Sequence, residues 1–202
     1  MKNNIITETE NLIVKYGTIE DYVAVHQFDF NYLQGLKGEN GEIINERVAR
    51  TPEEVRSWFT KDPSIEEHHK RMESEKTYEY IIYLKKEEKI IPIGDIGFDR
   101  YDESLNSLEI SCWLHPDYWG NSYTSEALIP TMDYIFSLGY DNIIYSFDSE
   151  NERSRRNCEK MGFEFYKCDE KAHNCFGVDS SLYTYIMSKE KYNEKHKHSK
   201  KK

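Results

Sequence analysis

A short polar loop lies between an apolar run and a helix-like stretch, and its residues could bind an anion. The run ends near Leu114, and Gly120, Asn121 and Ser122 follow before a helical pattern begins. The first amide N–H groups of a helix have no acceptor within the helix, and with the helix dipole they bind phosphate. Small residues such as Gly120, Ser122 and Thr124 let a phosphate approach the backbone. A turn that binds no ligand also favours small residues, so both interpretations stay open from this loop alone.

A second candidate is a group of cations within an acidic chain. The stretch NERSRRNCEKMGF, residues 151–163, places four cations within eight positions: Arg153, Arg155, Arg156 and Lys160. Cations on a helix are often simply solvated, but these oppose the sign of their surroundings. The pattern therefore predicts either a solvated helix face or a site for an anion.

Hydrophobic periodicity shows which elements must position these residues. Strand-like alternation predicts strands over residues 11–16, 77–86, 89–101, 107–114, 142–148, 163–168 and 181–188. Helical spacing predicts helices from residue 18, from 51 to 75 with a break near 62–63, over 122–138 and over 151–161. Residues 35–50 read as a loop. Alternating helices and strands, with a three-strand meander in the middle, predict an α/β domain whose sheet has mixed strand directions.

Capping residues mark several of the predicted helix ends. Thr18 with Asp21 three residues later predicts the start of the first helix. Before residue 152 either Ser149 or Asn151 suits an N-cap. Gly162 suits the C-terminal end of that helix, where a left-handed residue is common.

Composition and charge limit the class of protein. The chain has 202 residues, of which 38% are apolar, and this suits one globular domain over residues 1–189. Residues 1–188 carry 20 basic and 35 acidic side chains, whereas residues 189–202 carry seven Lys and two Glu. We expect residues 190–202 to be a solvated, disordered tail, with a nucleic-acid arm as the alternative. An acidic body repels nucleic acid and favours cationic partners such as amines.

Several other classes of site and location are not favoured. No apolar run approaches the roughly 20 residues of a membrane span, and the N-terminus lacks an apolar leader. Cys168, His173 and Cys175 match no usual zinc spacing, so we expect no metal. The pair His68 and His69 is expected to be exposed, as are His196 and His198. We expect a cytoplasmic monomer or homodimer with no membrane contact.

Four stretches together resemble the GNAT family of acetyl-CoA-dependent N-acetyltransferases, in the branch that includes the RimJ and RimL enzymes. They are IGDIGF (93–98), LEISCWLHPDYWGNSYTSEAL (108–128), NERSRRNCEKMGF (151–163) and DSSLYTYIMSKEKY (179–192). Their order and spacing are similar to those of that branch over about residues 11–189. The resemblance implies a mixed, mostly antiparallel central sheet flanked by helices, with a splayed strand pair that receives the cofactor.

The resemblance also implies which residues hold acetyl-CoA. The family's phosphate loop, Q/R-x-x-G-x-G/A, corresponds to residues 119–124 and departs from the pattern at Trp119, Ser122 and Thr124. An N–H near Leu114 would polarise the thioester carbonyl, and Asn151 would contact the pantetheine arm. The full set of implied cofactor-binding residues is Trp113, Leu114, Trp119, Gly120, Asn121, Ser122, Tyr123, Thr124, Asn151, Ser154 and Arg156.

For catalysis, the resemblance implies a carboxylate that takes a proton from the amine and a group that protonates the thiolate. Glu109 is the expected base, acting directly or through water, with Asp95 and Asp99 as lesser alternatives that also read as surface charges. Ser154 is the expected proton donor. Cys158 stands where many members have Tyr, and it reads as either a donor or a packing residue.

The predicted function is transfer of an acetyl group to a primary amine by direct attack on the thioester. The acceptor is expected to be a small molecule or a protein N-terminus, and four residues are candidates to line its site: Tyr32, Tyr78, Tyr183 and Asp179. The alternative is an acyl-CoA-binding module with weak or lost catalysis.

Overall fold

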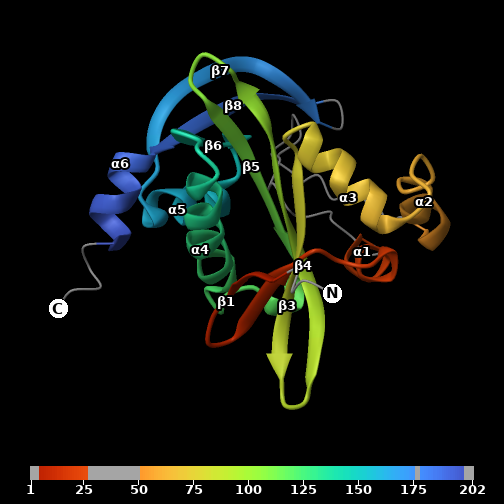
Figure 1. The fold of residues 1–202 in the computed structure, drawn as a ribbon. Helices are drawn as coiled ribbons and strands as arrows, with labels where there is room; N and C mark the ends of the chain where they lie inside the picture. Colours follow the sequence, from red (N-terminus) through yellow and green to blue (C-terminus); the bar gives the residue numbers. More distant parts are fainter. Residues whose placement is uncertain (1–4, 27–50, 176–177, 198–202) are drawn as a thin grey trace. The chain divides into compact units, whose positions relative to one another are not determined.

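The computed structural model describes residues 5–26, 51–175 and 178–197 (Figure 1). The chain forms two compact units. Of the described residues, the first unit contains 5–26, 51–100 and 110–139, and the second contains 101–109, 140–175 and 178–197.

The first unit is a sheet with helices on both faces. Its strands lie in the order β1-β2-β3-β4-β5, and the β1–β2, β2–β3 and β3–β4 pairs are antiparallel. The strands are β1 (Ile5–Glu8), β2 (Leu12–Lys15), β3 (Tyr78–Lys86), β4 (Lys89–Asp102, to residue 100) and β5 (Ser107–Leu114, from residue 110). The helices are α1 (Ile19–His26), α2 (Pro52–Ser57), α3 (Ile65–Ser74), the short 3-10 helix η1 (Pro116–Tyr118) and α4 (Tyr123–Ser137).

Alternation along β3 explains why this sheet is covered on both faces. Successive strand residues point to opposite sides. Ile81 packs into a buried cluster with Tyr22 of α1 and Val55 of α2. Its neighbour Tyr80 meets Tyr134 of α4, with 6.4 Å between ring centroids. Figure 1 shows the result, with α1, α2 and α3 on one side of β3 and β4 and α4 on the other.

Side-chain caps fix the helices of the first unit as the sequence predicts. Thr18 and Asp21 bond each other's backbone N–H at the start of α1. Thr51 and Glu54 form the same reciprocal pair before α2. Ser64 caps α3, so the predicted break near residues 62–63 is confirmed. Strand β1 was not predicted, because its four residues are half-exposed and lack a regular apolar alternation.

The second unit is built on strands in the order β5-β6-β8-β7. Its elements are the first residues of β5, then β6 (Asn142–Asp148), α5 (Glu152–Met161), β7 (Glu164–Cys175), β8 (Val178–Ser188), α6 (Lys189–Tyr192) and the π-helix η2 (Asn193–Lys197). The β5–β6 pairing is parallel and joins residues 107–109 to residues 142–144. The β6–β8 and β7–β8 pairs are antiparallel. The fold is therefore α/β with a mixed, mostly antiparallel sheet flanked by helices, as predicted.

Two regions differ from the expectations drawn from sequence. The structure places α6 and η2 within the stretch expected to be a solvated tail, and Tyr192 there is 3% exposed. His68 and His69 were expected to be exposed, and this is wrong, because both are buried, at 5% and 8% exposure. The predicted loop over residues 35–50 lies outside the described residues. No helix in the described ranges is both long and apolar enough to span a membrane.

Candidate active site

The loop between β5 and α4 has the geometry of an anion cradle. Gly120 and Ser122 both have left-handed backbone conformations, with φ of 81° and 62°. The side chain of Asn121 donates to the carbonyl oxygens of Tyr118 and Trp119, at 3.1 and 3.2 Å, and so closes the turn from within. A Cβ placed on Gly120 would meet nothing within 4 Å, so the space beside this residue is open. The loop therefore has a fixed shape and an open side.

The amides of this loop have no acceptor among the described residues. Within the described residues, the N–H groups of residues 120–125 donate to no backbone or side-chain acceptor, and the next amide, that of Glu126, bonds the carbonyl of Ser122 at 3.0 Å. Ser122 is the N-cap of α4 and makes no side-chain capping bond. Unpaired amides at the positive end of a helix dipole form a site for a phosphate group.

Glu126, the acid in the first turn of α4, is held by the β1–β2 turn. Its carboxylate accepts bonds from the hydroxyl of Thr9 at 2.5 Å and from the backbone N–H of Asn11 at 3.0 Å. Burial alone would raise the pKa of Glu126, but these hydrogen bonds outweigh it and the pKa is lowered. Glu126 is thus an ionised side chain with its own partners rather than a ligand for the loop amides.

The end of β5 is attached firmly to both β4 and the loop. The indole N–H of Trp119 donates to the carbonyl of Leu114 at 2.7 Å, and the N–H of His115 donates to the carbonyl of Ile93 at 2.8 Å. A Cβ on Gly94 would lie 2.2 Å from the carbonyl oxygen of Trp113, so only glycine allows this approach. Trp113 and Leu114 lie in the same unit as residues 119–124.

The predicted base, Glu109, belongs to the second unit. It is half-buried on β5, and its strand position pairs with Ile144 of β6. Cys112 and Leu114 follow on the part of β5 that belongs to the first unit. Burial, with a smaller effect from the charge of Asp95, raises the pKa of the Cys112 thiol well above its usual range.

Asn151 and Ser154 lie together at the start of α5 in the second unit. Asn151 is the N-cap, and its side-chain oxygen accepts a bond from the N–H of Ser154 at 3.1 Å. Asn151 is thus confirmed as the cap over the alternative Ser149. Because the oxygen is used for capping, the amide nitrogen of Asn151 is the group that remains for a ligand. Gly162 ends the helix with φ of 101°, as predicted.

The cations of α5 are partly neutralised by their own helix. Arg155 forms an ion pair with Glu152 at 2.5 Å, and this interaction raises the pKa of the guanidinium. Arg156 is exposed and donates from Nε to the carbonyl oxygen of Glu152 at 3.3 Å. The exposed side chain of Arg156 is therefore better placed to reach an anion than Arg155.

Cys158 is a packing residue. Its side chain is fully buried, and burial raises the pKa of its thiol well above the usual range. A thiol in this state is a poor proton donor for a thiolate, because the charge left behind would be buried. Of the two interpretations of Cys158, the structure supports packing.

No group of three or more possible metal ligands occurs among the described residues. Cys168 is exposed on β7, and the side chains of His173, Cys175 and Asp179 are outside the described set, as is Tyr32. Of the tyrosines proposed for the acceptor side, Tyr78 lies on β3 in the first unit and Tyr183 on β8 in the second.

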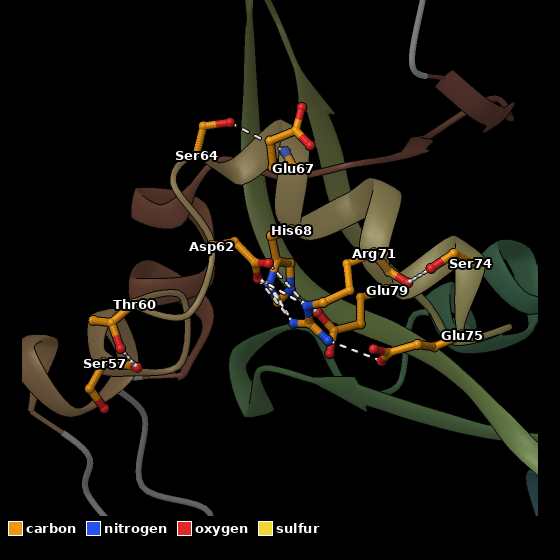
Figure 2. Close-up of polar contacts among 10 residues, drawn as sticks. All are labelled: Ser57, Thr60, Asp62, Ser64, Glu67, His68, Arg71, Ser74, Glu75 and Glu79. Atoms are coloured by element: carbon orange, nitrogen blue, oxygen red, sulfur yellow. Dashed lines mark hydrogen bonds and ion pairs between the residues drawn. The ribbon is translucent and has the colours of Figure 1, made fainter.

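Sequence reasoning missed a partly buried polar network under α3, with His68 at its centre. Figure 2 shows Asp62, His68, Arg71 and Glu79 drawn together by hydrogen bonds and ion pairs. His68 bonds Asp62 through Nδ1 at 2.9 Å and approaches Glu79 through Nε2 at 3.4 Å. The only signal in the sequence was two adjacent histidines in a polar helix, a pattern that usually indicates exposure.

Comparison with known proteins agrees with this geometry. Residues 35–164 match the acetyltransferase (GNAT) domain family. The uncharacterized N-acetyltransferase YoaA of Bacillus subtilis (strain 168) is 36% identical over 73 residues, which are 36% of this chain and 41% of YoaA. The match thus spans less than half of that relative.

Two solved structures have a similar fold. One is the RimL ribosomal L7/L12 alpha-N-protein acetyltransferase in complex with coenzyme A, with a TM-score of 0.71 at 16% identity over 93% of this chain and 99% of that one. The other is the microcin C7 self immunity acetyltransferase MccE in complex with acetyl-CoA and AMP, with a TM-score of 0.68 at 16% identity over 89% and 93%. The chain belongs to the acetyltransferase (GNAT) domain family.

Proposed function

We propose that the protein is an acetyl-CoA-dependent N-acetyltransferase of the RimJ/RimL-like branch. The observation that carries this proposal is the row of unpaired amides over residues 120–125, next to an open side of the loop at Gly120. These groups suit the diphosphate of coenzyme A. The similar structures of RimL and MccE, which contain coenzyme A and acetyl-CoA, support the same assignment.

The end of β5 supplies the groups that would hold the acyl end of the cofactor. Trp113 and Leu114 present backbone groups beside the loop, because Trp119 ties the loop to the carbonyl of Leu114. We assign the N–H near Leu114 to polarisation of the thioester carbonyl, a role that stabilises the charge developing on the oxygen. Within the loop, Tyr123 and Thr124 contribute amides along with Gly120, Asn121 and Ser122.

The resemblance assigns further cofactor contacts to residues at the start of α5. The side-chain oxygen of Asn151 accepts from the N–H of Ser154, so the amide nitrogen is the proposed donor to the pantetheine arm. The hydroxyl of Ser154 is the proposed proton donor to the departing thiolate, and Arg156 is the proposed partner of a phosphate group. These three roles rest on the family resemblance.

A carboxylate must receive the proton of the acceptor amine, because an ammonium has no lone pair with which to attack. The resemblance implies Glu109, which is five residues before Leu114. Glu109 is proposed to take this proton directly or through water, as the resemblance implies.

The acceptor is proposed to be a primary amine, of a small molecule or of a protein N-terminus. Residues 1–188 carry 20 basic and 35 acidic side chains, and this charge attracts a cationic substrate. The same charge argues against nucleic acid as a partner. We place the reaction in the cytoplasm, with a monomer or homodimer as the working form.

Release of thiol from acetyl-CoA, measured with a panel of amines and N-terminal peptides, tests the proposal. At least one amine is expected to accelerate release, with an acetylated product visible by mass spectrometry. If acetyl-CoA binds but no amine or peptide accelerates release, the protein is an acyl-CoA-binding module instead. If acetyl-CoA does not bind at millimolar concentration, both functions are wrong.

A further inference from the structure

Asp95 of β4 lies beside the end of β5. It directly follows Gly94, whose Cα faces the carbonyl oxygen of Trp113 and the Cα of Leu114 so closely that a Cβ would clash with both. Consecutive Cα atoms are about 3.8 Å apart, so the backbone of Asp95 is within a few ångströms of the β5 segment that we assign to the thioester. Among the carboxylates named above as candidate bases, Asp95 is the one whose place next to Leu114 follows from contacts inside the first unit.

The carboxylate of Asp95 is largely buried and has an unused hydrogen-bonding position. Its side chain is 23% exposed, and Oδ1 is buried without a hydrogen-bond partner in the described ranges. Oδ2 lies 3.8 Å from Nε2 of His26 on α1, which is too long for a hydrogen bond. A buried carboxylate oxygen without a donor is costly for a fold, and such a group is commonly kept for a ligand.

Aromatic rings lie near His26, the α1 residue that faces Asp95. The ring of His26 lies 6.2 Å from Trp113 of β5 and 5.1 Å from Trp58, which follows α2. The region around His26 and Asp95 thus combines aromatic rings with a carboxylate. Both features favour an ammonium group over an anion or a neutral polar group.

Other ionisable groups face Asp95 from each element packed against it. They are Glu79 of β3, Tyr22 and His26 of α1 and Cys112 of β5. Burial, with the negative charge of Glu79, raises the pKa of Asp95 to about 7. A carboxylate with such a pKa is matched to proton transfer near neutral pH.

The partly buried network under α3 positions Glu79. His68 is 5% exposed and bridges Glu79 to Asp62, while Arg71 holds Asp62 through Nε at 3.0 Å (Figure 2). The hydroxyl of Tyr22 also reaches the backbone carbonyl of Glu79 at 3.4 Å. Glu79 lies two residues before Ile81, the cross-strand partner of Asp95, and His68 is a positioning residue for the Glu79 carboxylate.

We propose that Asp95 receives the acceptor ammonium and takes its proton, and that Glu79, positioned by His68, helps to hold the cation and tunes Asp95. This inference rests on the proposed acetyltransferase function and names its acceptor subsite, for a primary ammonium. It also replaces Glu109 with Asp95 as the group that contacts the amine.

The reaction balances with the chain and the two substrates alone. The ammonium R–NH3+ gives one proton to the Asp95 carboxylate and becomes R–NH2. Its lone pair forms the C–N bond at the thioester carbon, and the C–S bond breaks with its electrons on sulfur. The nitrogen then loses a second proton. One of the two protons neutralises the thiolate and the other leaves to solvent, so the products are the amide, coenzyme A thiol and one H+.

The first test compares Asp95→Asn with Asp99→Asn, the same change four residues further along β4. Asp95→Asn should lower kcat/KM at pH 8 by a factor of about 10² to 10⁴, the usual size of general-base catalysis. Calorimetry should show acetyl-CoA binding within about twofold of wild type for both variants. Asp99→Asn should retain activity.

The second test is the pH profile, which a purely structural role would not change. Wild-type kcat/KM should fall tenfold per pH unit below about pH 7. In Glu79→Gln this acidic limb of the pH profile should shift to lower pH, because a negative charge near Asp95 is removed. His68→Gln should move it in the same direction if His68 holds Glu79 in place.

The outcomes separate this inference from the function on which it rests. If wild type acetylates an amine but Asp95→Asn is equally active, or if Glu79→Gln leaves the limb in place, the assignment to Asp95 is wrong and the function stands. Loss of activity in Glu109→Gln with full activity in Asp95→Asn would return the role to Glu109. If wild type neither binds acetyl-CoA nor acts on any amine, the proposed function itself fails.

Discussion

Ser122 stands in a backbone conformation that glycine adopts most easily. Its φ of 62° and ψ of 12° place it in the left-handed region directly before α4. This conformation costs a residue with a Cβ roughly 1 kcal/mol. The N–H of Ser122 has no acceptor among the described residues, so we propose that the departure from the family pattern leaves the anion cradle in place.

Replacing Ser122 with glycine is expected to stabilise the protein without weakening the cofactor site. The free energy of unfolding should rise by about 0.5–1 kcal/mol, because relief of the strained φ outweighs the added entropy of the unfolded chain. Urea denaturation measures this change. The matched control is Gly120→Ala, which should lower stability by about 1 kcal/mol, because φ at Gly120 is 81° although no atom would clash. A loss of stability in Ser122→Gly would contradict the assigned backbone conformation.

Asp95 gives a second prediction at the residue scale, on stability and pH. Its pKa is raised to about 7 in the folded protein, from 3.8, so the folded state binds more protons between these values. Stability from this group is present at low pH and is lost as pH rises toward 7 and above. Asp95→Asn should therefore be more stable than wild type at pH 8, by up to roughly 4 kcal/mol at about 1.4 kcal/mol per pKa unit.

The difference in stability between wild type and Asp95→Asn isolates this effect, whereas the stability of wild type alone does not. Burial lowers the pKa of His69 to about 4, which makes wild-type stability fall in acid for a separate reason. Thermal melts of both proteins from pH 4 to pH 8 would show the gap open with rising pH. A gap that is constant across this range would show that Asp95 titrates normally.

At the residue scale, sequence predicted the loop but not the acceptor side. Residues 119–124 can be recognised from the local sequence, because small polar residues follow a strand and precede a helix. His68 does not, because its partners Asp62 and Glu79 come from a connection and a strand on either side of α3. Burial of Asp95 likewise depends on α1 and β5, which no local pattern around residue 95 reports.

At the scale of elements, the approach of β4 to β5 holds the candidate site together. Gly94 lets the backbone of β4 come against the carbonyl of Trp113 and the Cα of Leu114. The bond from His115 to Ile93 fastens the same place. The end of β5 is thus positioned by backbone contacts rather than by side chains.

Gly94→Ala is expected to disrupt this contact. Its Cβ would lie 2.2 Å from a backbone oxygen, so β5 must move, and stability should fall by about 1–3 kcal/mol together with acetyl-CoA affinity. Gly97→Ala on the same strand is the control. There the clash is with the hydroxyl of Ser111, which can rotate away. Calorimetric titration of both variants checks the prediction, and equal affinities would show that the contact does not shape the site.

Element boundaries were predictable where caps or strong alternation define them. Strand β6 and helices α1, α2 and α5 begin where the sequence predicts, because Thr18, Thr51 and Asn151 cap their helices with their own side chains. Strands β7 and β8 are longer than predicted. Their outer residues are polar, so pairing with each other rather than an apolar pattern defines their length.

At the scale of the whole molecule, the class of fold was predictable and the strand order was not. The family resemblance rests on four motif stretches. Their order and spacing can be read from the sequence without knowing which residues are in contact. The position of β8 between β6 and β7 depends on pairing between residues far apart in sequence, such as Tyr145 with Tyr185. Such pairings are decided by the whole sheet rather than by local propensity.

The charge of the molecule favours the same class of acceptor as the site does. The acidic body attracts cations over distances comparable to the Debye length of about 8–10 Å, and Asp95 with Glu79 is the proposed binding site for the cation. Long-range attraction and local recognition thus both point to an ammonium substrate.

The central claim is that the backbone amides of residues 120–125 bind the diphosphate of coenzyme A. Amide chemical shifts in a titration with coenzyme A test it most directly. We predict that the N–H signals of residues 120–125 move the most and saturate together, because these amides have no acceptor in the part of the chain that the structure describes. Saturable binding that leaves these signals in place, or no binding at millimolar coenzyme A, would contradict it.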